Sequence, residues 1–276
     1  MAFLRIFLLT LSFVFFIEVS AYEIPALTLR YPSGKASLQT FTTLVEMETD
    51  LPGFLLSETI KQKVVAEVRL LADGDKEEGA LPNQVEVVLK SLSAEIQGNG
   101  VKTILDTEGN STSLEFAQLK EILDRPIFFR LSPNFSLEES PDLALVQKDF
   151  PLAGEFINHE MFSDMFQYLF ILGGQELRPG IKLPRKNDIE IDINRADRRE
   201  VQATFLGNIR KKEGGGLDEN VGLFQGILSG TGSWQSDNAL LYRVKVHQSL
   251  SGLLKNEGES VPVKMKITHW IDSKPL

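Results

Sequence analysis

Residues 37–49 of the chain read SLQTFTTLVEMET, and this stretch decides the fold class. Phe41, Val45 and Met47 fall on one face of an extended chain, whereas Glu46 falls on the opposite face. Alternation with a period of two residues is typical of a half-buried β-strand. The sequence therefore favours a fold that is built mainly from strands.

The same alternation predicts further strands along the chain. A meander is expected from residues 64–71, 84–97 and 101–106, with a polar turn at 73–83 and a second turn at 98–100. The side chains change face near residues 90–92, which indicates a bulge. Glycine-rich residues 221–234 predict a bulged or tightly curved strand. The other late strands are expected at residues 188–194, 201–209, 239–248 and 260–272.

The middle of the chain carries helix signals. Thr112 and Glu115 have the spacing of a capping box, and Pro126 ends that helix. A second helix is predicted to begin at Ser140, and a third spans residues 158–172.

We therefore predict a mainly β fold with a helical middle, in the α+β class. It consists of two antiparallel meander modules, or of one large curved sheet with helices packed on it. The expected division is a signal peptide at 1–21, an N-terminal β module at 22–135, a helical connection at 136–179 and a C-terminal β module at 180–276.

The first residues are typical of a secretory signal peptide. A basic start is followed by twelve uncharged residues, 6–17 (IFLLTLSFVFFI), and by the small residues Ser20 and Ala21. A bilayer core needs about 20 apolar residues, so a retained anchor is disfavoured. We expect cleavage after Ala21 and no transmembrane segment in the mature chain.

Composition restricts the classes of function. The chain contains no cysteine, which excludes disulfides, thiol nucleophiles, cysteine-type zinc sites and a lipid-anchored N-terminal cysteine. Its net charge of −9 argues against a nucleic-acid partner. Export without disulfides favours a periplasmic or extracellular protein of a bacterium.

Candidate metal and catalytic motifs are weak. Asp188, Glu190 and Asp192 share a strand face, but alternation with isoleucine is what a one-sided sheet produces. His159 begins a helix without a second histidine four residues later, and G-x-S-x-G does not occur. His247 and His269 show no metal-ligand spacing. We predict no catalytic residue, metal or cofactor, and hence no enzyme.

The helix at 158–172 carries the one feature that suggests a function. Its broad apolar face either packs in the core or lines a cavity for an apolar ligand, because methionine and phenylalanine adapt to irregular lipid shapes. The candidate ligand-lining residues are Met161, Phe162, Met165, Phe166, Leu169 and Phe170.

The layout resembles uncharacterised exported bacterial β-rich proteins, the domain-of-unknown-function families. The likeness rests on the signal, the turn and helix at 106–123, the segment 128–133, the Gly173–Gly174 stop and the segment 228–234. The resemblance implies an envelope location and no activity.

Two hypotheses of function follow. The first is an exported non-catalytic envelope protein with a binding or structural role towards an unknown target, for example another envelope protein. The alternative is a periplasmic carrier of a lipid or other apolar ligand, which resembles the half-barrel lipoprotein carriers. An exported hydrolase would need an acid, a base and a nucleophile clustered in a pocket.

Overall fold

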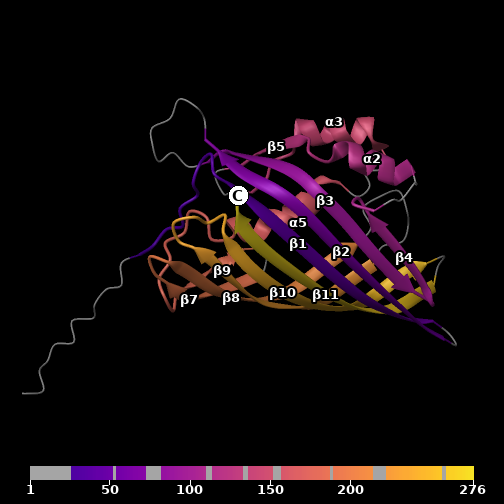
Figure 1. Ribbon diagram of the computed structural model, residues 1–276. Coiled ribbons are helices and arrows are strands. Elements are labelled where there is room, and N and C mark those ends of the chain that lie inside the picture. Colours follow the sequence, from indigo (N-terminus) through magenta and orange to yellow (C-terminus); the bar gives the residue numbers. More distant parts are fainter. Residues whose placement is uncertain are drawn as a thin grey trace, which may run out of the picture.

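The chain forms one long-stranded antiparallel sheet in the computed structural model (Figure 1). The structure describes residues 26–51, 54–72, 82–109, 114–132, 136–151, 157–186, 189–213, 222–256 and 259–276. The sheet has 11 strands in the order β4-β3-β2-β1-β11-β10-β9-β8-β7-β6, and β5 pairs with β3 beside β4.

The strands on the N-terminal side are β1 (Ala36–Leu51), β2 (Phe54–Leu71), β3 (Gln84–Gly98), β4 (Val101–Asp106) and β5 (Pro126–Arg130). Those on the C-terminal side are β6 (Lys182–Lys186), β7 (Ile189–Ala196), β8 (Glu200–Glu213), β9 (Gly222–Gln235), β10 (Tyr242–Asn256) and β11 (Glu259–Pro275). The described helices are α2 (Leu114–Ile122), α3 (Pro141–Asp149) and α5 (His159–Phe170).

The predicted α+β class with a helical middle is wrong. Strands make up 61% of the structure and helices only 14%, so the protein is mostly β. The strands extend beyond the alternating segments from which they were predicted; β2, for example, begins at Phe54 rather than near residue 64. Backbone pairing continues through polar residues, because a sheet with one exposed face accepts them.

The two predicted meanders lie in one continuous sheet because β1 pairs with β11. The register joins Phe41 to Ile271 and Glu46 to Lys266. Directly opposed residues of antiparallel strands share a face, so apolar side chains meet on one side and charged ones on the other. We call the side that carries Phe41 the inner face and the side that carries Glu46 the outer face.

Several local predictions are confirmed. Val65 pairs with Ser91 and Ala66 with Leu89, which leaves Lys90 as the extra residue of a bulge. Asn99 and Gly100 turn the β3–β4 hairpin with φ angles of 52° and 77°. The predicted capping residue Thr112 and most of the predicted turn at 73–83 lie outside the described residues.

Side-chain caps explain where two helices begin. The Ser140 hydroxyl accepts a hydrogen bond from the Leu143 N–H at 3.2 Å, as predicted for this position. Asn158 caps α5 in the same way, because its Oδ1 accepts from the Met161 N–H at 2.8 Å. Figure 1 shows α5 behind β1, β2 and β3, and shows α2 and α3 near the β3 side of the sheet.

The core lies between α5 and the inner face. Phe162 of α5 contacts Phe129 of β5 with ring centroids 4.8 Å apart, and Phe166 contacts Phe41 of β1 at 5.7 Å. Near the other end of the helix, Tyr168 contacts Phe205 of β8. Because β5 and β8 lie on opposite sides of β1 in the sheet, α5 runs across the strands.

Glycines in β9 allow the backbone of β10 to come close. A Cβ atom at Gly226 would lie 1.9 Å from the Ser249 carbonyl oxygen, and one at Gly232 would lie 2.4 Å from the Trp234 ring. Distances this short leave no room for a side chain at either position. The register between β9 and β10 continues without a bulge. Close packing, and not a bulge, therefore accounts for these glycines.

Gly226→Ala should therefore destabilise the protein by about 3 kcal/mol, because the added methyl group displaces backbone rather than a flexible side chain. Urea unfolding measures the change. Gly98→Ala is the matched control, since its Cβ would lie 3.5 Å from Glu58 Cγ, an ordinary contact. Equal stability of the two variants would contradict this packing.

Three buried tyrosines make the fold sensitive to alkaline pH. Burial raises the pKa of the Tyr31, Tyr168 and Tyr242 hydroxyls, so the folded protein favours their neutral form. Their contribution to stability is complete below the ordinary tyrosine pKa of about 10 and is lost as the pH rises above it. The Tyr242 hydroxyl is buried without a hydrogen-bond partner, whereas the Tyr31 hydroxyl donates to the Leu169 carbonyl.

Tyr242→Phe should leave the unfolding free energy at neutral pH within about 1 kcal/mol of the original, and should reduce its loss above pH ~10. Urea unfolding over a pH series tests this. Tyr31→Phe serves as the contrast. This substitution removes a hydrogen bond, so it should lower the unfolding free energy by about 1 kcal/mol already at neutral pH. If the unfolding free energy of Tyr242→Phe falls with rising pH as steeply as that of the original protein, Tyr242 does not contribute to the alkaline loss of stability.

Candidate ligand site on the inner face

The six candidate residues of α5 divide into two groups. Phe162, Phe166, Leu169 and Phe170 are at most 2% exposed and belong to the core. Met161 and Met165 line a cavity of about 350 Å³ between the N-terminal half of α5 and the sheet. The helix therefore places its aromatic side chains in the core and its two methionines at the cavity.

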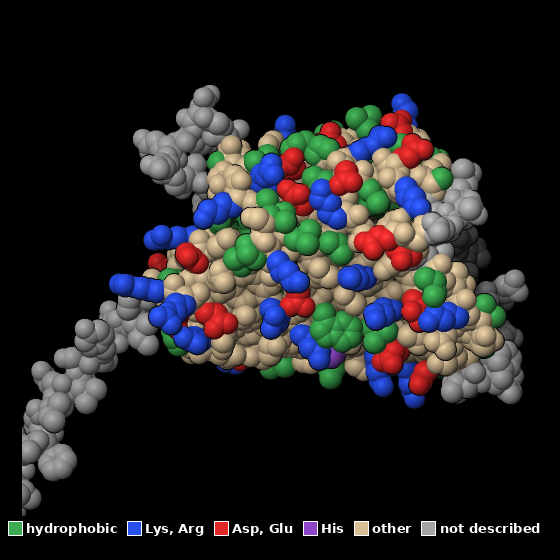
Figure 2. Space-filling view, viewed as in Figure 1, with side chains coloured by type: hydrophobic (Ala, Val, Ile, Leu, Met, Phe, Trp, Pro, Cys, Tyr) green, Lys and Arg blue, Asp and Glu red, His purple; other side chains and the backbone are tan. Residues whose placement is uncertain are grey.

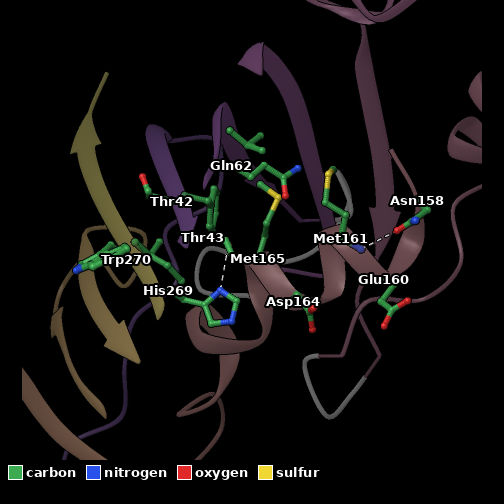
Figure 3. Close-up of a pocket in the computed structure, with 13 residues that line it drawn as sticks. Thr42, Thr43, Gln62, Asn158, Glu160, Met161, Asp164, Met165, His269 and Trp270 are labelled. Carbon is green, nitrogen blue, oxygen red and sulfur yellow. Dashed lines mark hydrogen bonds between the residues drawn. The ribbon is translucent and has the colours of Figure 1, made fainter. Parts of the chain in front are cut away.

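The cavity lies where α5 passes over β1, β2 and β11 (Figure 3). Thr43, Gln62 and His269 enter it from these three strands, and they occupy one row of the register. The side chains of Thr42 and Trp270 point away in Figure 3. The remaining lining residues are Phe41, Val64, Ile271, Asn158, Glu160 and Asp164.

Polar groups gather on the sheet side of the cavity. His269 Nδ1 lies 3.1 Å from Thr43 Oγ1, and His269 Nε2 lies 3.5 Å from the side-chain nitrogen of Gln248. Gln248 stands one row further along the inner face, because it pairs with Ile267. The chain thus holds His269 between a hydroxyl and an amide.

Tyr168 of α5 joins this polar group through Gln248. Burial is the main cause that raises the pKa of its hydroxyl, and the negative charge of Asp164 raises it further. A hydrogen bond with Gln248 acts in the opposite direction. Tyr168 is therefore a neutral hydrogen-bonding group near neutral pH.

An apolar surface continues from the cavity along the inner face. Beyond the Thr43 row come Val45, Ile60 and Ile267, and these side chains are only half-buried. The corresponding side chains under α5, Phe41, Val64 and Ile271, are 2–5% exposed. Beyond the half-buried row is a second, smaller hydrophobic cluster: Phe224, Leu250 and Val263, packed against Met47, Ile209, Met265 and Ile267.

Helix width explains why apolar surface remains beside the helix. An α-helix with its side chains is about 10–12 Å wide. Strand β1 has 16 residues, which corresponds to about 50 Å along its axis. Because α5 runs across the strands, it covers only a fraction of their length.

The weak metal candidates have other partners. Lys182 pairs with Glu190 and lies 3.6 Å from Asp192, while Asp188 lies outside the described residues. His159 contacts Ser163, and His247 contacts Thr268. Among the described residues, no group of three or more His, Asp or Glu side chains is placed to hold a metal ion.

No family model matches the chain, and a search of curated proteins finds no match. In the part of the chain that the structure describes, every helix is too short or too polar to cross a membrane.

Sequence reasoning missed the sheet side of the site. Thr43 and Gln62 come from consecutive strands and His269 from the last strand, and each looks like an ordinary strand residue by itself. The sequence did contain one signal: each of these polar side chains interrupts a strand face that is otherwise apolar.

Proposed function

We propose that this protein binds an apolar ligand with a long hydrocarbon chain on the inner face of its sheet. It acts as an exported, non-catalytic carrier in a bacterial envelope. The observation that carries the proposal is the half-buried row Val45, Ile60 and Ile267, which continues from the cavity beside α5. Both surfaces lie on the same face of β1, β2 and β11.

The dimensions fit a lipid chain. Small-molecule pockets usually enclose about 300–1,000 Å³, and the cavity of 350 Å³ falls within this range. From Thr43 to Thr49 the inner face extends for about 20 Å along an antiparallel strand. Burial of each CH₂ group of a ligand would contribute about 0.8 kcal/mol. A chain placed along this surface would thus be held without a specific polar contact.

The other hypothesis is an envelope protein with a binding or structural role towards an unknown target. The distribution of charge on the outer face does not point to a particular partner. Figure 2 shows that lysine and arginine side chains are mixed with aspartate and glutamate across this face. Such mixing is ordinary for a solvated surface. The inner face therefore favours the carrier over a protein that only contacts other proteins.

Val45→Asp should weaken binding of a fluorescent fatty alcohol about tenfold or more, because it places a charge in the apolar surface. Leu44→Asp is the matched control: the neighbouring side chain is also half-buried but points to the outer face. Fluorescence titration measures affinity, and thermal unfolding verifies that both variants fold.

Equal weakening by Val45→Asp and Leu44→Asp would place binding elsewhere. No binding to the original protein, together with no lipid retained in native mass spectrometry after purification from a bacterial envelope, would contradict the carrier.

Export has its own test. When the full chain is expressed in a bacterium, we expect the mature protein in the periplasm or medium with Tyr22 as its first residue. Intact-mass measurement of the purified protein identifies that residue. A protein that keeps residues 1–21 in the cytoplasm would contradict the export proposal. Replacing Ala21 with a bulky residue should block cleavage, because signal peptidase requires a small side chain there.

A further inference from the structure

The cavity beside α5 has an acidic edge. Glu160 and Asp164 stand four residues apart on α5, so they lie on the same side of the helix. Both side chains are exposed, and Figure 3 shows that their carboxylates extend from α5 away from Gln62 and the two methionines. None of the described residues that line the cavity is a lysine or an arginine. His269 is the one lining side chain there that can carry a positive charge.

The start of α5 does not compensate for this negative charge. A helix N-terminus attracts anions through its free N–H groups. Here the Met161 N–H donates to Asn158 Oδ1 at 2.8 Å, and the Phe162 N–H donates to the Asn158 carbonyl. Glu160 adds a carboxylate in the first turn. An anionic head group would therefore meet a like charge beside these two occupied donors.

A buried polar side chain, Gln248, lies behind the sheet side of the cavity. Gln248 is 9% exposed, and its Oε1 atom is buried without a hydrogen-bond partner. Its side-chain nitrogen lies 3.5 Å from His269 Nε2, next to the cavity. An unsatisfied buried acceptor is unfavourable, but Gln248 lies behind His269 and is not part of the cavity lining.

We propose that the ligand is an amphiphile with a protonated amine as its head group. This inference rests on the proposed function. The ammonium lies at the edge formed by Glu160 and Asp164 and donates hydrogen bonds to their carboxylate oxygens. The hydrocarbon chain extends from there along the inner face, past Val45 and Met47. Fatty acids and phosphate-bearing lipids bind less tightly, because their charge is repelled.

The test compares three probes of equal chain length: dodecylamine, dodecanol and dodecanoate. Each displaces a neutral fluorescent probe from the purified mature protein near pH ~7 at low ionic strength. Exposed ion pairs are weak individually, so we expect dodecylamine to bind on the order of tenfold tighter than dodecanoate, with dodecanol between them. Added salt should reduce the difference.

The double variant Glu160→Gln with Asp164→Asn should bring the amine and carboxylate affinities within about twofold of each other and leave dodecanol unchanged. Glu46→Gln with Glu48→Gln is the matched control. It changes the net charge equally, but on the outer face, where both side chains are exposed. This control should keep the preference for the amine.

The outcomes separate the two proposals. Equal binding of amine and carboxylate by the original protein overturns the head-group inference and leaves the carrier intact. An equal effect of the two double variants also overturns it, because net charge alone would then set the preference. If none of the three probes binds, the carrier proposal itself fails.

Discussion

Pairing of β1 with β11, from Ser37 opposite Pro275 to Thr49 opposite Val263, holds together strands from the two ends of the described chain. Its register must be specific, because a slip by one residue would turn Phe41 and its neighbours towards solvent. The pairs Phe41–Ile271 and Glu46–Lys266 separate apolar from charged side chains on the two faces. All other strands extend outwards from this central pair. The cavity also lies over it, so the candidate site exists only when this pairing has formed.

Helix α5 determines how much of the inner face beside it remains available to a ligand. Phe162 and Phe166 fill the space against β5 and β1, and they make α5 a part of the core. Because the helix crosses the strands, the row Val45, Ile60 and Ile267 beside it on the inner face is left half-buried. The edge of α5 at this boundary carries Met161 and Met165, together with Glu160 and Asp164. An apolar surface with an acidic end is the combination that a cationic amphiphile requires.

Much of the local structure was predictable. The bulge at Lys90, the turn at Asn99 and the cap at Ser140 each follow from a few consecutive residues. The fold class was wrong because helices are easily recognised by their caps, whereas strand pairing extends through segments without clear alternation. At the site, the apolar stripe of α5 was evident. Its division into core phenylalanines and cavity methionines depends on which side of the helix meets the sheet.

The amino-acid sequence by itself determined the alternation of the strands, several turns and helix starts, and the exclusion of all cysteine chemistry. These properties depend on residue type and on neighbours along the chain. Only the tertiary structure decided that β1 and β11 make one sheet, and that Thr43, Gln62 and His269 face α5 across a cavity. Such contacts join residues about a hundred or more positions apart, and their geometry follows from register, twist and packing that short-range patterns do not contain.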